Sequence, residues 1–331
     1  MELPKIIRIS NRNKVTLAIS TIGATIVSLE VPNYQGQPTN VVVGLSKAED
    51  YVEDLYLKEG LYLGATIGRH AGRVSKKHIT IERKIFPIHH TNGVHLHGGK
   101  EGFDKKLWKV EAITMGSSPS VTLSYVSNHL EEGYLGTLKV FVTYTLTEEN
   151  ALKIQYKATT DQTTIVNLTN HSYFNLDGEG SILNHQLEIH SDSYLDLDKQ
   201  LIPTGKINSV SGTQFDYTNT TSVGRTGFKG LDDIFVLNEN DPKVILSSKK
   251  SGIQMKVFTN QPAVVVYTPP KFAALPFKNN AIYSDFPAIC FETQKYPDAI
   301  HNDHFPSVLL KPNETYNNET IFLFSNIRKS I

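Results

Sequence analysis

The sequence of 331 residues contains a single cysteine, no excess charge of either sign and no long apolar run. Because Cys290 stands alone, an intrachain disulfide and a cysteine-based zinc site are excluded. The 33 Lys and Arg residues balance 33 Asp and Glu residues, so the chain lacks the basic surface of a nucleic-acid binder and a polybasic membrane anchor. No segment approaches the roughly 18 apolar residues that span a bilayer, and the first residues lack the apolar block of a signal peptide. We therefore expect a cytoplasmic protein without nucleic-acid or membrane partners.

Apolar and polar residues alternate along much of the chain. In segment 138–146 one face carries Leu, Val, Val, Tyr and Leu, and 151–158 repeats the pattern after a turn at 148–150. Successive strand residues point to opposite faces, so this period of two predicts antiparallel sheet with one wet face. Strands do not alternate with long helical segments, which disfavours a parallel α/β fold. We predict one large β domain with further strands at 15–19, 25–31, 107–113, 121–126, 163–168, 253–257, 263–267 and 320–324, short helices at 47–53 and 298–305, and a long loop at 208–230.

Histidines gather in one short segment, where His89, His90, His95 and His97 fall within nine residues and two glycines follow. Histidine is the side chain whose ordinary pKa lies nearest neutrality, and glycine permits close approach of a ligand or backbone. One interpretation is a polar loop at a functional site, and another is a solvated loop with surface histidines. A third is metal binding, because His95 and His97 would share a face of a strand.

A second polar cluster, 167–178, follows an apolar strand, and strand ends are where a rigid scaffold passes into functional loops. His171 is the functional candidate in this cluster, whereas Tyr173 and Phe174 are expected to be core residues. The alternative is that His171 only forms a local hydrogen bond.

A carboxylate ends the apolar run 288–291. A buried charge is costly unless it is paired or used, so Glu292 is either exposed at a sheet edge or held in a pocket for acid–base work. Cys290, on the same strand, is expected to pack as a small hydrophobic residue.

Arg69 and Arg73 lie in the glycine-rich segment 64–74, and guanidinium groups offer forked donors to hydroxyl and carboxylate groups. The chain has no dinucleotide fingerprint, no phosphate-binding GxxxxGK[ST] loop and no GxSxG nucleophile elbow. The residues alone therefore predict a β protein with an acid–base site for a small polar ligand.

The ordered motifs resemble those of the aldose 1-epimerase (galactose mutarotase) family. They are GATIGRHAGRV (64–74), LHGGKEGFDKKLW (96–108), NLTNHSYFNLDG (167–178), GLDD (230–233) and FETQKYPDA (291–299). The resemblance implies an all-β fold, a large antiparallel β-sandwich with few short helices, as a single domain over 1–331. It also implies a monomer or homodimer that interconverts the α and β anomers of a free hexose, such as galactose or glucose, without cofactor or metal.

The resemblance also implies a role for each matching residue. Glu292 would be the general base at the anomeric hydroxyl, His171 the general acid at the ring oxygen, and His97 would hold the sugar. Arg73 and Asp232 would hydrogen-bond sugar hydroxyls. A carboxylate and an imidazolium suit this chemistry, because ring opening removes a proton from one oxygen and delivers one to its neighbour.

The chain departs from the family pattern in the expected sugar-binding region. Gly72, counted among the substrate-binding residues, stands where the family has Asn, Asp233 where it has His, and Val265 where some members have Gln. Segment 268–270 also differs. These departures motivate an alternative, a non-catalytic sugar-binding or sensing protein of the same fold. Two others are a hexose-6-phosphate 1-epimerase and a metal-dependent isomerase or hydrolase.

Overall fold

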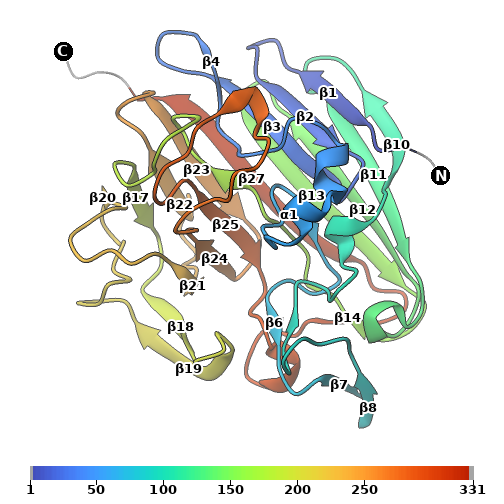
Figure 1. Ribbon diagram of the computed structural model, residues 1–331. Helices are drawn as coiled ribbons and strands as arrows, with labels where there is room; N and C mark the ends of the chain where they lie inside the picture. The colour runs from blue at the N-terminus through green and yellow to red at the C-terminus, as the bar shows by residue number, and fades with distance from the viewer. Residues whose placement is uncertain (1–2, 328–331) are drawn as a thin grey trace.

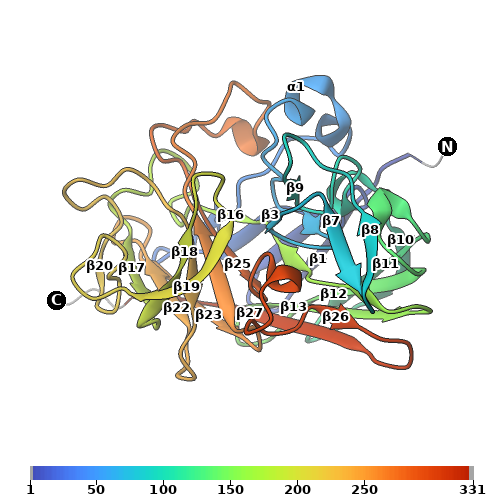
Figure 2. The same cartoon turned by 90° about the horizontal axis from the view of Figure 1, so that it is seen from below.

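The alternating segments form antiparallel strands in the computed structural model, which describes residues 3–327 (Figures 1 and 2). The largest sheet has nine strands. Their order is β10 (Lys109–Thr114), β11 (Ser120–Ser127), β12 (Leu138–Leu146), β13 (Ala151–Thr160), β27 (Tyr316–Asn326), β23 (Ile253–Thr259), β22 (Val244–Ser247), β17 (Gln186–Ile189) and β20 (Thr221–Ser222).

A six-stranded sheet carries most of the residues that matter for function. Its order is β16 (Tyr173–Phe174), β25 (Ile289–Gln294), β24 (Ala263–Tyr267), β21 (Asp232–Val236), β18 (Ser193–Leu197) and β19 (Pro203–Ser209). A third sheet contains β1 (Ile6–Ser10), β2 (Thr16–Ser20), β3 (Thr25–Pro32) and β4 (Pro38–Asn40). Short pairs complete the fold: β5 (Thr66–Ile67) with β15 (Thr169–Asn170), β6 (Arg73–Val74) with β9 (His95–Leu96), β7 (His78–Ile81) with β8 (Lys84–Pro87), and β14 (Thr164–Ile165) with β26 (Leu309–Leu310).

The main apolar core joins the six-stranded sheet to the nine-stranded sheet. Phe174 and Phe291 of the smaller sheet and Phe322 of β27 belong to one buried cluster, and the rings of Phe174 and Phe322 lie 4.9 Å apart. On β25, Phe291 points into this core, so the alternating residues Cys290 and Glu292 point to the opposite face of the sheet. The same alternation that builds the core therefore delivers a carboxylate to the other side.

The all-β prediction is confirmed, and so is the hairpin of β12 and β13 around the predicted turn. Strand 163–168 is shorter than predicted: β14 ends at Ile165 because the backbone of Asn167 bonds to Arg69 and Ala71 instead. Helices are short in the described chain: η1 (Glu49–Val52), α1 (Asp54–Leu57), η2 (Phe103–Lys105), η3 (Glu131–Gly133), η4 (Lys278–Asn280) and η5 (Ala299–His301). Among residues 3–327, none of them has the length and apolar character needed to cross a membrane.

Candidate active site

A cavity of about 170 Å³ lies on the face of the six-stranded sheet that points away from the main core. Register explains which side chains reach it. Asp232 is the cross-strand partner of Tyr267, Ile234 pairs with Val265, and Val265 pairs with Glu292. All five residues line the cavity, because strand positions two residues apart share a face. Segment 59–62, residues at β6 and β9, and the loop before β16 also line the cavity.

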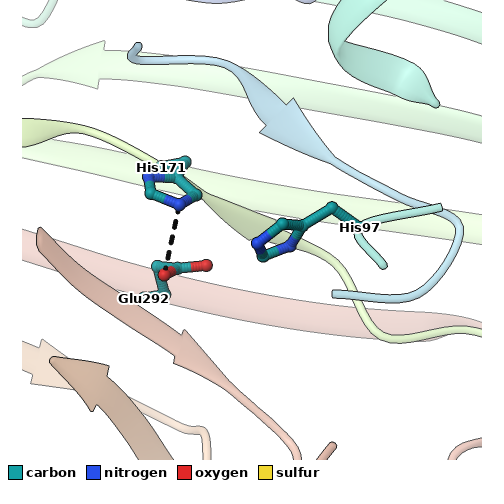
Figure 3. A group of neighbouring side chains, drawn as sticks. All are labelled: His97, His171 and Glu292. Atoms are coloured by element: carbon teal, nitrogen blue, oxygen red, sulfur yellow. Dashed lines mark ion pairs between the residues drawn. The ribbon is translucent and has the colours of Figure 1, made fainter. Parts of the chain in front are cut away.

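Glu292 and His171 meet inside this cavity (Figure 3). Oε1 of Glu292 lies 3.4 Å from Nε2 of His171, and both side chains are almost fully buried. Burial raises the pKa of Glu292 well above its ordinary value; the charge of Asp232 adds to this and Arg73 opposes it. Burial lowers the pKa of His171 to about 4. Burial therefore favours the neutral form of both groups.

Aromatic rings hold the imidazole of His171 in place. The ring of Tyr173 stacks on it with centroids 5.0 Å apart, and the ring of Tyr62 lies nearly parallel at 5.8 Å. The hydroxyl of Tyr173 donates to the carbonyl of Leu61, next to Tyr62, at 2.5 Å. These contacts fix the ring orientation that aims Nε2 at Glu292.

His97 approaches the same pair from the loop after β9, and its ring lies edge-on to His171 at 5.4 Å (Figure 3). Its Nδ1 accepts a hydrogen bond from the backbone N–H of Gly72 at 3.3 Å. Burial, together with the neighbouring His171, lowers the pKa of His97 well below its ordinary value. A neutral ring whose Nδ1 is an acceptor carries its proton on Nε2, so His97 offers a donor to the cavity.

The same three side chains are also the group in the described chain that could hold a metal ion. One donor atom from each of His97, His171 and Glu292 lies within 4.8 Å of the other two. Imidazole nitrogen and carboxylate oxygen are common zinc ligands.

Arg73 and Asp232 form the charged wall of the cavity. Nη2 of Arg73 lies 3.6 Å from Oδ2 of Asp232, and both side chains are partly exposed to the cavity. Burial raises the pKa of Asp232 and the Arg73 charge opposes that shift. At 3.6 Å the two groups attract each other but leave hydrogen-bonding capacity for a polar ligand.

The close packing of neighbouring residues explains why a glycine stands at position 72. Its φ is +76°, and a Cβ at this position would lie 2.6 Å from Cγ of Pro297. Gly72 therefore contributes its backbone to the site, with its N–H bonded to His97 and its carbonyl accepting from the N–H of His97. A side chain such as the Asn of the family pattern has no room here.

Two polar residues tie the segments of the site together. Asn167 accepts the N–H of Lys295 through Oδ1 and that of Ala71 through its carbonyl. Asp298, buried after the strand that carries Glu292, accepts from the N–H of Ser75 at 2.9 Å and from its hydroxyl at 2.8 Å. Ser75 directly follows β6, so the chain segment after Glu292 is bonded to the segment that presents Arg73.

The structure brings together Glu292, His171, His97, Arg73, Asp232 and Gly72, but other sequence interpretations need correction. Arg69 lies outside the cavity: it is buried, and its guanidinium donates to Ser127 and to backbone carbonyls of 127–136. Asp233 points to the other face of β21, as Phe235 does. Cys290 is buried among apolar residues, as predicted.

The histidine-rich segment does not converge on one point. His95 is fully buried and bonds to the hydroxyl of Tyr134, whereas His97 faces the cavity. The two do not share a face because β9 ends at Leu96 and His97 has a φ of +50°. His89 lies near Glu132 instead.

Sequence reasoning missed three tyrosines of the site. Tyr173 was predicted to be core; it is buried, but it also lines the cavity and stacks on His171. Tyr62 and Tyr267, which were not singled out, also line the cavity. The only signal for Tyr267 was its place at the end of a short apolar strand, and none distinguished Tyr62.

Fold and site together define a β-sandwich protein whose cavity offers acid–base groups and hydrogen-bonding charges to a small polar molecule. Residues 5–323 match the sequence pattern of the family described as "Aldose 1-epimerase". The chain belongs to this family.

Named relatives match this chain over nearly its whole length. It is similar to galactose mutarotase of Sus scrofa, 40% identical over 324 residues that cover 95% of this chain and 92% of the relative. It is also similar to aldose 1-epimerase of Escherichia coli, 31% identical over 336 residues that cover 97% and 95%. Among solved structures, an aldose epimerase homologue from C. elegans superposes with a TM-score of 0.90 at 29% identity, covering 98% of this chain and all of that one. Galactose 1-epimerase from Lactobacillus acidophilus gives 0.84 at 26% identity, covering 99% and 100%.

Proposed function

We propose that this protein is an aldose 1-epimerase that interconverts the α and β anomers of a free hexose such as galactose or glucose. The observation that carries the proposal is the buried contact between Nε2 of His171 and Oε1 of Glu292 in a cavity with hydrogen-bonding walls. An acid and a base must flank one hemiacetal for its ring to open, and this pair lies close enough to do so. The family and its named relatives support the same reaction.

In the proposed reaction Glu292 removes the proton from the anomeric hydroxyl and His171 protonates the ring oxygen. The ring opens to the aldehyde, the bond between C1 and C2 rotates, and closure on the other face returns the proton. The starting form is a carboxylate beside an imidazolium. It differs from the neutral pair of the sugar-free cavity only by transfer of one proton across the 3.4 Å contact. The charge of Arg73, which lowers the pKa of Glu292, favours that transfer.

The remaining residues would bind the sugar rather than exchange protons with it. His97 would donate through Nε2 to a sugar oxygen, because its Nδ1 is already occupied by the N–H of Gly72. Arg73 and Asp232 would hydrogen-bond the hydroxyls that do not react. Such charge-assisted bonds are directional, so they can hold the sugar while its anomeric carbon changes configuration.

The cavity favours a free sugar over a sugar phosphate. Among the described residues that line it, Arg73 is the single Lys or Arg, and it already faces Asp232. A phosphate dianion would need further cationic donors to replace its hydration. A hexose 6-phosphate is therefore expected to be a poor substrate.

Polarimetry on freshly dissolved anomers tests the proposal. The protein should accelerate the relaxation of α-galactose or α-glucose, with much less effect on glucose 6-phosphate. Calorimetric binding of the free sugars without any rate enhancement would refute catalysis and identify a sugar-binding protein. Acceleration confined to the phosphorylated sugar would refute the proposed substrate. Organisation as one domain, a monomeric or homodimeric state and a cytoplasmic location stay predictions.

A further inference from the structure

Glu292 has a second carboxylate oxygen that its contact with His171 leaves available. Oε1 lies 3.4 Å from Nε2 of His171, whereas Oε2 is buried and has no hydrogen-bond partner among residues 3–327. Figure 3 shows one carboxylate oxygen turned toward His171 and the other toward the side of His97, and one donor atom of each side chain lies within 4.8 Å of the other two. A buried acceptor without a partner is costly, so Oε2 is suited to accept a hydrogen bond from a ligand in the cavity.

A site that serves both anomers has to receive an oxygen on either face of the anomeric carbon. The C1 hydroxyl occupies one position in the α anomer and the other position in the β anomer, while the ring oxygen stays beside His171. Between these two states C1 is a planar carbonyl carbon, and an oxygen nucleophile attacks it to close the ring. The proposed epimerase therefore already supplies an acid and a base for adding oxygen to a carbonyl at C1 and for the reverse step.

A second class of molecule needs the same groups in the same places. An aldono-1,5-lactone is the six-membered ring of an aldose with a carbonyl at C1 in place of the hydroxyl and the hydrogen. Addition of water to this carbonyl gives a carbon that bears two oxygens at once, in the positions that the α and β hydroxyls occupy in turn. A site with an oxygen position on each face of C1 therefore matches the tetrahedral intermediate of lactone hydrolysis, and such a match is what accelerates a reaction.

We propose that this cavity also hydrolyses aldono-1,5-lactones to aldonic acids, with Glu292 as the general base for water and His171 as the general acid for the ring oxygen. The inference rests on the proposed function, because it uses the same acid and base, and it adds a second reaction at that site. The ring oxygen is the leaving group in both reactions. Only the oxygen that carries the abstracted proton differs, since it belongs to water rather than to the sugar.

The protons and electron pairs of the hydrolysis balance within the cavity. Glu292 removes a proton from water, the water oxygen bonds to C1, and the π pair of the carbonyl moves onto the carbonyl oxygen. His97 donates through Nε2 to this oxyanion, because its Nδ1 already accepts from Gly72. The carbonyl re-forms as the bond from C1 to the ring oxygen breaks, and His171 protonates that oxygen. The proton on Glu292 then passes to His171 across the 3.4 Å contact, which restores the starting pair.

A pH-stat assay on glucono-1,5-lactone tests the inference, because hydrolysis releases one equivalent of acid and epimerisation releases none. The unmodified protein should release acid faster than buffer alone. Galactose should suppress this excess rate with an inhibition constant close to its KM in polarimetry, since two substrates of one site compete. Glu292→Gln and His171→Asn should each lower the excess rate by about 10²–10⁴, whereas Cys290→Ala, buried in an apolar cluster, should retain it.

Three results would overturn the inference. The first is epimerisation of galactose without acid release above that of buffer. The second is acid release that galactose does not suppress, and the third is acid release that Glu292→Gln leaves unchanged, because the reaction would then occur elsewhere. Suppression by galactose is measured on the unmodified protein, so it decides the question even where a variant does not fold. Failure of the proposed function looks different, because galactose itself would then not be epimerised.

Discussion

Lowering the pH should destabilise the protein through a buried histidine in the scaffold of the site. His70 follows Arg69 and precedes the segment of Gly72 and Arg73. Its backbone forms an isolated parallel β-bridge with Asn167, and the residue is fully buried. Burial lowers its pKa to about 3, with the nearby His95 adding to the shift. In the unfolded chain a histidine titrates near 6.5.

The sign and size of the effect follow from proton linkage. Between pH 6.5 and about 3 the unfolded chain binds a proton at His70 and the folded chain does not, so stability is lost as the pH falls. From pH 7 to pH 5 the loss attributable to His70 is about 2 kcal/mol. The value changes little for any folded pKa below about 4, because the folded state is then unprotonated throughout this range.

Urea unfolding at pH 7 and pH 5 measures this contribution. In His70→Gln the difference in unfolding free energy between the two pH values should be about 2 kcal/mol smaller than in the unmodified protein. The exposed His90 provides the matched control, and His90→Asn should leave the difference unchanged. An unaltered difference in His70→Gln would refute the reasoning, whatever its effect on absolute stability.

Three further predictions concern the site. The kcat/KM should stay constant from neutrality to about pH 5 and fall near pH 4, because burial lowers the pKa of His171 to about 4; an acid limb near 6.5 would contradict this. The alkaline limb should reflect loss of the proton from Glu292, whose pKa is raised by burial. Gly72→Ala should lower the unfolding free energy by about 2 kcal/mol or more in urea titrations, because its Cβ meets Pro297 at a positive φ, and an unchanged midpoint would refute the clash. Asp298→Ala should lower the unfolding free energy by about 3 kcal/mol and raise KM more than it lowers kcat, since it frees the segment that presents Arg73 to the cavity; a fall in kcat alone would argue against that role.

Local patterns predicted much of the fold because strand periodicity is a local property. The alternation in 138–146 predicted β12 and the short apolar run 263–267 predicted β24, both with their observed bounds, and the acidic turn between β12 and β13 predicted their hairpin. The strand at 163–168 was overestimated because Asn167 satisfies its backbone through partners distant in sequence. Such partners leave no trace in the local pattern.

Predicting the site required more than spacing. From its own neighbourhood, Glu292 could equally have been exposed at a sheet edge, and only the register of three strands shows that it is buried in a cavity. Arg69 and Arg73 have similar glycine-rich surroundings, yet one is enclosed by carbonyls and the other faces Asp232. Tyr62 could not have been found because stacking on His171 depends on tertiary contact alone.

The central claim is that His171 and Glu292 share the proton that opens the sugar ring. The most direct test is polarimetry of α-galactose with His171→Asn and Glu292→Gln beside Cys290→Ala, a buried control two residues from Glu292 on the same strand face. Each of the first two changes should reduce the catalysed rate by about 10²–10⁴, whereas the control should retain it. Full activity in both His171→Asn and Glu292→Gln would contradict the account.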